Sequence, residues 1–92
     1  MKKLITSLLF VLISSTAFAQ DDGLKIHISV DLEGIAGAVT GEQLGTGGFE
    51  YQRFREFATA EALAAVEAAF EAGATEVLVA DSHGNGQNLL IE

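Results

Sequence analysis

Two apolar stretches, each ending in polar residues, organise the sequence. In the first, apolar side chains occupy every second position: Leu24, Ile26, Ile28 and Val30. This period of two predicts a β-strand over Lys25–Asp31. The second stretch, Glu76–Ala80, is apolar after its first residue, which is typical of a strand that is covered on both faces of a sheet.

The segment between them, Glu50–Ala72, has the composition of a helix, because alanine and glutamate are both good helix formers. Its apolar positions form two adjoining stripes. One stripe contains Thr59, Leu63, Val66 and Phe70, and the other contains Phe54, Ala58, Ala62, Ala65 and Ala69. Together they predict a broad apolar face that packs on a sheet. Gly73 is the expected end of the helix.

A strand, a helix and a second strand in this order predict a parallel βαβ unit with a right-handed crossover. The expected fold class is therefore α/β. Two strands and one helix bury little apolar surface, and Asn88–Ile91 begins a further apolar stretch. We therefore expect residues 20–92 to be the N-terminal part of a longer protein, the start of a larger layered αβα domain. We expect this part alone to be inactive and poorly folded.

Polar side chains follow both predicted strands. Asp31 and Glu33 come after the first strand, and Asp81, Ser82 and His83 come after the second. The carboxyl ends of parallel strands meet at one edge of the sheet, where ligands of α/β proteins bind, so we expect these groups to converge. In an extended chain Asp31 and Glu33 point to the same side and could bind one cation; the alternative is a solvated turn.

Carboxylates and imidazole without cysteine suit Zn²⁺, Mn²⁺ or Fe²⁺, so Asp31, Glu33 and His83 are candidate metal ligands. The alternative for His83 is a capping or loop histidine. Asp81 could itself be a ligand, but it is expected rather to orient His83 or to bind the loop backbone. Ser82 beside a histidine without a third partner is poor evidence for a nucleophilic triad. His27, in the middle of the first strand, is expected to be a packed or half-exposed residue.

The loop between the first strand and the helix, residues 34–48, is rich in glycine. Glycine occupies positions 34, 37, 41, 45, 47 and 48. Long loops are often functional, but a flexible connector would have the same composition, and both interpretations stay open. The loop fits neither a dinucleotide-binding nor a P-loop motif.

The first nineteen residues have the pattern of a secretory signal. Lys2 and Lys3 precede the apolar segment Leu4–Ile13, and Ala17-Phe18-Ala19 is a cleavage motif before Gln20. The apolar segment is shorter than the ~20 residues that a membrane anchor needs. We therefore predict a signal peptide over residues 1–19, export to the periplasm or beyond, and a mature form without a membrane segment.

Charge and cysteine content narrow the classes of partner. The chain has a formal net charge of −8 and no cysteine. An acidic chain does not bind nucleic acid by counterion release or anionic lipid by charge attraction. Without cysteine, disulfides and thiolate metal sites are excluded.

Three segments, in order, resemble the zinc-dependent D-aminopeptidases of peptidase family M55. Residues 29–37 resemble the family's S-x-D-x-E-G-[IV]-[SA]-G. Arg55 with residues 59–62 resembles R-x-x-x-T-x-E-A, and residues 73–84 resemble G-x-x-E-[VI]-x-V-x-D-S-H-G. The chain departs from the family at Leu63 and Ala80, where asparagine is usual.

The resemblance implies that Asp31 bridges two zinc ions, that Glu33 binds one of them and that His83 binds the other. The remaining ligands and the catalytic histidine of the family are expected beyond Glu92, so no catalytic residue is identifiable here. The implied activity is hydrolysis of small peptides with an N-terminal D-residue such as D-Ala, by a zinc-activated water. A homo-oligomeric assembly is implied as well.

Two other functions fit parts of the pattern. Phosphotransferases of the haloacid-dehalogenase type carry D-x-D-G-T after an apolar strand. Here Glu33 replaces the second aspartate and Ile35 replaces the threonine, and both changes count against that chemistry. The second alternative is an exported, non-catalytic module that binds a metal or ligand at the same edge of the sheet.

Overall fold

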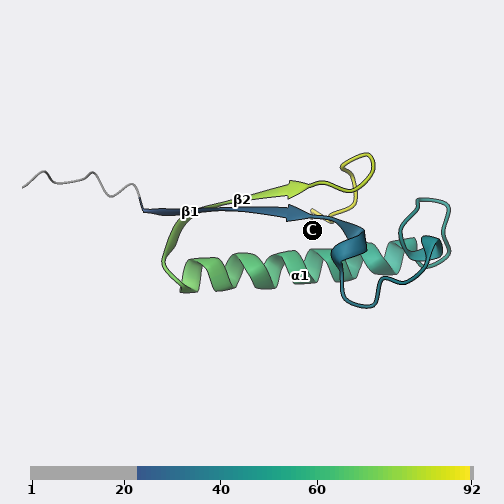
Figure 1. Ribbon diagram of the computed structural model, residues 1–92, viewed down its shortest axis with the longest axis horizontal. Coiled ribbons are helices and arrows are strands. Elements are labelled where there is room, and N and C mark those ends of the chain that lie inside the picture. The colour runs from purple at the N-terminus through teal and green to yellow at the C-terminus, as the bar shows by residue number, and fades with distance from the viewer. Residues whose placement is uncertain (1–22, 92) are drawn as a thin grey trace, which may run out of the picture.

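The computed structural model describes residues 23–91, so the predicted signal peptide lies outside the described residues. The elements are, in order, β1 (Leu24–Val30), the 3₁₀ turns η1 (Leu32–Gly34) and η2 (Gly41–Gln43), α1 (Tyr51–Glu71) and β2 (Ala74–Asp81). β1 and β2 pair in parallel, and α1, which connects them, runs antiparallel to both (Figure 1). The predicted α/β class and the parallel βαβ unit are confirmed.

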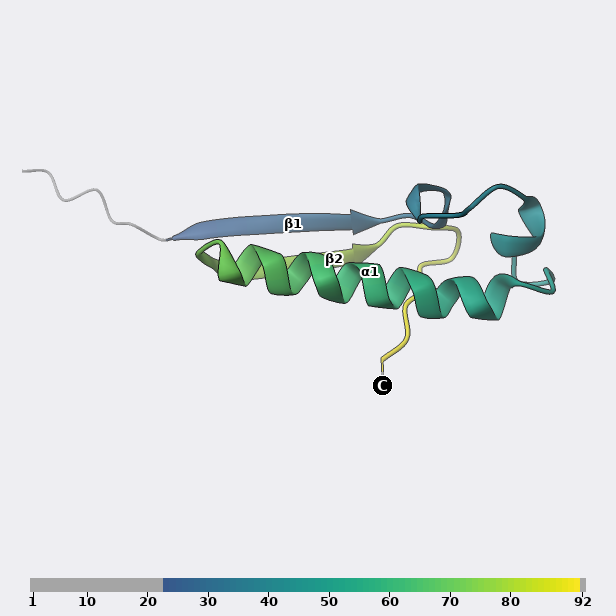
Figure 2. The ribbon, with the colours of Figure 1, turned by 90° about the horizontal axis from the view of Figure 1, so that it is seen from below.

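α1 covers one face of the sheet formed by β1 and β2 (Figures 1 and 2). Ile28 pairs with Val79, and both pack against the core beside α1. The next pair, His27 and Leu78, lies on the opposite face, where both residues are exposed. The prediction that the second strand is covered on both faces is therefore wrong within the described residues, since Leu78 is 61% exposed.

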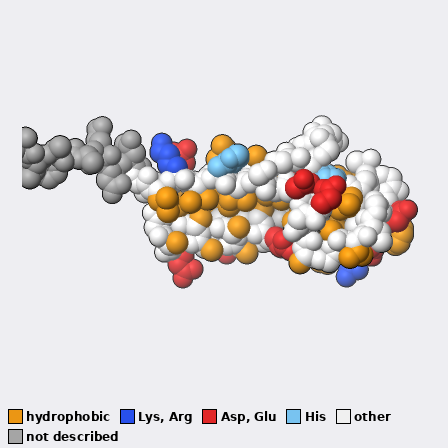
Figure 3. Space-filling view, in the orientation of Figure 1, with side chains coloured by type: hydrophobic (Ala, Val, Ile, Leu, Met, Phe, Trp, Pro, Cys, Tyr) orange, Lys and Arg blue, Asp and Glu red, His pale blue; other side chains and the backbone are white. Residues whose placement is uncertain are grey.

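The hydrophobic core lies between α1 and the sheet. Its buried members are Val30, Leu32, Ile35, Tyr51, Phe54, Ala58 and Ala62. The small side chain of Ala58, which is fully buried, lets the helix approach the strands closely. Figure 3 shows hydrophobic side chains in a band along the side of the molecule, between sheet and helix.

Of the two predicted apolar stripes of α1, one is buried over Phe54, Ala58 and Ala62, although Ala65 further along it is exposed. Leu63 and Phe70, from the other stripe, are 56% and 49% exposed. Two strands make a narrow sheet, and it covers only the stripe that contains Phe54, Ala58 and Ala62. The remaining stripe stays open on the described part of the chain.

α1 ends at Glu71, one residue before the predicted end, and the chain turns at Gly73, whose φ of +104° is readily adopted only by glycine. Among residues 23–91, α1 and the shorter helical turns all lack the length or apolarity that a membrane-spanning helix requires.

The first strand ends one residue earlier than predicted. β1 stops at Val30, and Asp31 begins the tight turn η1, in which Gly34 N donates to Asp31 O (3.0 Å) and Ile35 N donates to Leu32 O (3.2 Å). Leu32, only 1% exposed, anchors this turn in the core. Burial of Leu32 thus bends the chain directly after the strand and sets the direction of the side chains beside it.

Candidate metal centre

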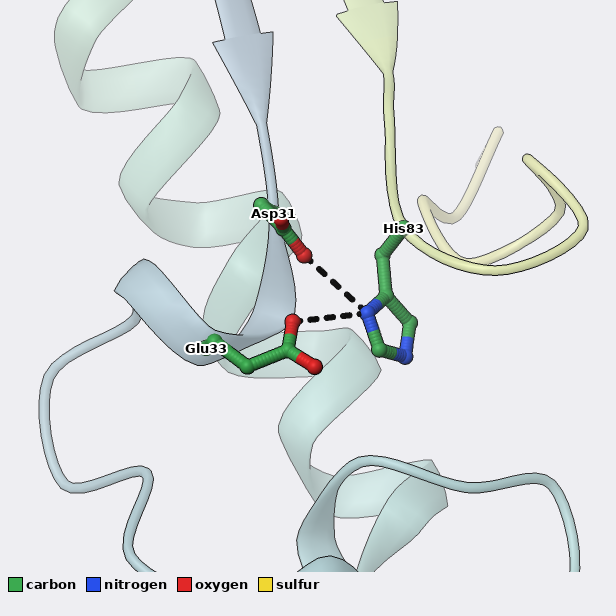
Figure 4. A group of neighbouring side chains, drawn as sticks. All are labelled: Asp31, Glu33 and His83. Atoms are coloured by element: carbon green, nitrogen blue, oxygen red, sulfur yellow. Dashed lines mark hydrogen bonds and ion pairs between the residues drawn. The ribbon is translucent and has the colours of Figure 1, made fainter.

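Asp31, Glu33 and His83 converge at the carboxyl ends of the two strands (Figure 4). His83 Nδ1 lies 3.0 Å from Asp31 Oδ1 and 2.8 Å from Glu33 Oε2. One potential ligand atom from each residue lies within 4.8 Å of the others. The predicted convergence of these three residues is therefore present in the structure.

The two carboxylates meet for a different reason from the one predicted. Asp31 and Glu33 were expected to share one side of an extended strand, but Glu33 lies in the 3₁₀ turn η1. Leu32, between them, points into the core, and the turn swings the Glu33 carboxylate towards Asp31 and His83. Ala36 N, just after the turn, donates to Glu61 Oε1 of α1 at 3.0 Å, and this bond fastens the turn to the helix.

The second ring nitrogen of His83 contacts the glycine-rich loop. Nε2 lies 2.6 Å from Leu44 O, and a carbonyl oxygen can only accept a hydrogen bond. Nε2 therefore carries a hydrogen, and Nδ1 is the nitrogen that faces the carboxylates. The His83 side chain is 15% exposed, whereas the side chains of Asp31 and Glu33 are 54% and 56% exposed. The cluster is open to solvent from the carboxylate side.

The contacts of the cluster change the pKa values of Asp31 and His83. Hydrogen bonding with the Glu33 side chain, and then with His83, lowers the pKa of Asp31. Partial burial alone would lower the pKa of His83, but its hydrogen bonds with Leu44 O, Asp31 and Glu33 outweigh burial, and the pKa is raised. The cluster therefore favours a positive charge between two carboxylates. One imidazole nitrogen and two carboxylates are a fitting donor set for Zn²⁺, Mn²⁺ or Fe²⁺.

Asp81 points away from this cluster and binds the chain that follows His83. Its Oδ2 accepts from Asn88 N (2.6 Å) and Leu89 N (2.8 Å), and its Oδ1 accepts from Asn88 Nδ2 (2.8 Å). Partial burial alone would raise the pKa of Asp81, but these hydrogen bonds outweigh burial, and the pKa is lowered. The ionised carboxylate thus closes the loop that carries His83.

Asn88 links that loop to the helix. It is 3% exposed, its Nδ2 also donates to His83 O, and its Oδ1 accepts from Tyr51 OH at 2.6 Å. Arg55 Nε donates to Asn88 O at 2.8 Å. Sequence reasoning missed Asn88 and Tyr51 as parts of the site. The one available signal was a polar residue directly before two leucines.

Ser82 lies on the other side of the strand end. Its hydroxyl is 2.6 Å from the hydroxyl of Ser29, and its backbone N donates to Val30 O at 2.9 Å. These contacts extend the pairing of the two strands by one residue and bring Ser82, the residue before His83, level with Asp31.

The glycine-rich loop has more structure than its composition suggested. It contains η2, which is closed by a capping box between Thr40 and Gln43. Gln43 is 7% exposed and was not identified from the sequence. The loop is therefore ordered around a buried glutamine and delivers the Leu44 carbonyl to His83.

The chain is similar to known D-aminopeptidases. The sequence profile of peptidase family M55, described as D-aminopeptidase, matches residues 24–92. A D-aminopeptidase of Bacillus subtilis (strain 168) is 42% identical over 69 residues, which cover 75% of this chain and 25% of that protein.

A solved structure gives the same result. It is that of the Zn-dependent D-aminopeptidase DppA from Bacillus subtilis, a self-compartmentalizing protease, and it matches with a TM-score of 0.71 and 41% identity. The match covers 74% of this chain and 25% of that chain, so the present chain spans a quarter of the length of these relatives. Because the profile match covers most of the sequence, the chain belongs to the M55 family of D-aminopeptidases.

Proposed function

We propose that the intact protein is a zinc-dependent aminopeptidase that hydrolyses small peptides with an N-terminal D-residue. The observation that carries the proposal is the convergence of Asp31, Glu33 and His83 within 4.8 Å. The donor set suits zinc, and the name of the DppA relative describes that protein as Zn-dependent. Family membership favours this chemistry over a phosphotransferase of the haloacid-dehalogenase type.

Each of the three residues would hold metal through a defined group. His83 would bind through Nδ1, since Nε2 is engaged by Leu44 O. Asp31 and Glu33 would bind through the oxygens that now face Nδ1. A carboxylate has two oxygens, and we propose that Asp31 bridges two zinc ions, with Glu33 on one and His83 on the other. Zinc supplies a Lewis acid that activates water and polarises a carbonyl group.

The other residues at this edge of the sheet orient these ligands. Asp81 and Asn88 hold the His83 loop, and Glu61 holds the turn after Glu33. We assign no catalytic base among residues 23–91. Before His83 can bind a cation, Nδ1 must release the proton that the two carboxylates stabilise, so metal and proton compete for the same position.

Location and assembly are further parts of the proposal. The signal-like pattern of residues 1–19 supports export, and residues 20–92 would be the first part of the peptidase domain. In the periplasm, peptides that contain D-Ala are the proposed substrates.

The DppA relative is described as self-compartmentalizing, which supports a homo-oligomer here. The exposed apolar side chains of Leu63, Phe70 and Leu78 fit further packing.

Hydrolysis by the zinc-loaded intact protein tests this function. We expect release of D-Ala from D-Ala-D-Ala and from D-Ala amide, with much slower release from the L-Ala counterparts. A chelator should abolish the activity and added zinc should restore it. Zinc binding without hydrolysis of any D-peptide would support the non-catalytic binding module instead.

A further inference from the structure

His83 is held through both nitrogens of its ring, and the two contacts differ in kind. Nδ1 faces Asp31 and Glu33 at 3.0 and 2.8 Å, and Nε2 lies 2.6 Å from Leu44 O. The carbonyl accepts, so Nε2 donates. Once the proton on Nδ1 is released, the hydrogen that Leu44 O holds on Nε2 leaves the lone pair of Nδ1 for a metal. The position of the Leu44 carbonyl therefore decides which nitrogen is available to a metal.

The loop that carries this carbonyl is rich in glycine, so its sequence alone does not make its backbone rigid. Glycines stand at positions 41, 45, 47 and 48, and glycine has the greatest backbone freedom of all residues. Leu44 N and Gly45 N both donate to Gly41 O, at 3.1 and 3.2 Å. These bonds close one turn of chain, and one backbone bond, from Gln43 N to Thr40 O at 3.2 Å, joins that turn to the residues before it.

The side chain of Gln43 fastens it. Oε1 accepts from Val39 N at 2.6 Å and from Thr40 N at 2.9 Å, and Nε2 donates to Gly37 O at 3.2 Å. The amide group of Gln43 thus bonds three backbone groups within residues 37–40. Gln43 directly precedes Leu44, whose carbonyl contacts His83. Because Gln43 is buried, loss of these bonds would leave desolvated polar groups without partners.

We propose that Gln43 is a positioning residue for His83: by ordering residues 37–45 it holds Leu44 O on Nε2 and keeps Nδ1 as the metal-binding nitrogen. This rests on the proposed metal site. The hydrogen-bond partner of a metal-bound histidine fixes its tautomer and ring orientation, and loss of such a partner weakens metal binding by about 10–100-fold. Gln43 acts one step further out, so its loss should weaken zinc binding by about 10-fold.

The variant Gln43→Met of the intact protein tests this role, since methionine matches glutamine in size without its hydrogen-bonding groups. Zinc affinity, measured by competition with a chelator, should fall about 10-fold. Gln43→Glu keeps an acceptor for the Val39 and Thr40 amides and should lose less. Gln87→Met is the matched control, because Gln87 is exposed, and it should bind zinc like the wild type. Wild-type affinity in Gln43→Met would overturn the proposal.

The histidine tautomer provides a readout that loss of stability alone would not change. Long-range ¹H–¹⁵N NMR on protein labelled at histidine, with the signal assigned by its loss in His83→Asn, should show hydrogen on Nε2 and zinc on Nδ1 in the wild type. Zinc-loaded Gln43→Met should show a mixture of Nδ1-bound and Nε2-bound zinc where the wild type shows zinc on Nδ1. Zinc on Nε2 of the wild type would overturn the proposal, even if Gln43→Met does not fold.

The proposed metal site and the role of Gln43 can be refuted separately. If the wild type binds no zinc, or binds it equally well in His83→Asn, the proposed metal site is refuted and the role of Gln43 with it. If the wild type binds zinc through His83 while Gln43→Met matches it in affinity and tautomer, only the role of Gln43 is refuted.

Discussion

Asp81 Oδ1 lies 2.8 Å from Asn88 Nδ2, and this bond closes the loop that presents His83 to the two carboxylates. The same amide nitrogen donates to His83 O, and the amide oxygen accepts from Tyr51 OH on α1. One buried side chain therefore connects the end of β2, the histidine and the helix. The geometry of the proposed metal ligands depends on this asparagine as well as on the strands.

Asn88→Ala should destabilise the intact protein by about 1–3 kcal/mol, because it leaves desolvated groups of Asp81, Tyr51 and His83 without their partner. Asn88→Asp should cost more, since it places a second carboxylate against the ionised Asp81. Zinc affinity should fall in both variants. Denaturant unfolding and chelator competition measure the two effects.

Gln87→Ala is the control for Asn88, because Gln87 lies in the same loop and is exposed. Its effect on the free energy of unfolding should stay within about 0.5 kcal/mol. Equal stability of the Asn88→Ala and Gln87→Ala variants would show that the buried network does not hold the loop.

Gly48→Ala should disturb the loop that supports Leu44. A Cβ at Gly48 would lie 2.1 Å from Glu42 O, whereas one at Gly47 would meet nothing within 4 Å. Neither residue has a positive φ, so the comparison isolates the steric effect. We expect Gly48→Ala to lose about 1–3 kcal/mol and to bind zinc more weakly, with Gly47→Ala close to wild type. Equal stability and zinc affinity in the two variants would contradict the close packing of this loop.

The stability of the metal-free protein should depend on pH through the same cluster. The pKa of His83 is raised, so its contribution is fully present below the ordinary value of 6.5 and is lost as pH rises through the raised pKa. The pKa of Asp31 is lowered, so its contribution is present above 3.8 and is lost as pH falls through the lowered pKa. The cluster should therefore stabilise the metal-free protein most between these two ordinary values.

Thermal unfolding at a series of pH values measures this dependence. In His83→Asn the decline on the alkaline side should be reduced, and matching profiles for this variant and the wild type would refute the assignment. Zinc should reverse the trend, because it displaces the proton from Nδ1, so zinc affinity should increase with pH across the titration of His83.

The fold and the meeting of the two strand ends could be predicted because they depend on periodic patterns. Alternation over Leu24–Val30 and an alanine-rich segment before Gly73 define a βαβ unit, and its geometry brings Asp31 near His83. That much follows from local sequence and from the handedness of the chain.

The remaining parts of the site depend on contacts that no periodicity encodes. Glu33 reaches Asp31 because Leu32 is buried and bends the chain, which could not be read from an i, i+2 spacing. Gln43 and Asn88 lie in loops, and their function comes from bonds to backbone groups that the fold brings near them. The predicted burial of β2 was too high for a related reason. An apolar stretch shows that both faces of a strand can be buried, but it does not show which elements bury them.

Zinc binding by the intact protein is the most direct test of the central claim, that Asp31, Glu33 and His83 form a metal site. Bound zinc and its affinity would be measured for the wild type, for Asp31→Asn and for Glu76→Gln. Asp31→Asn and Glu76→Gln each remove one negative charge. Glu76→Gln is the control, because Glu76 is exposed and its carboxylate pairs with Lys25 Nζ at 3.5 Å. We predict that the wild type and Glu76→Gln bind zinc alike and that Asp31→Asn loses most of it. Wild-type zinc content and affinity in Asp31→Asn would contradict the account.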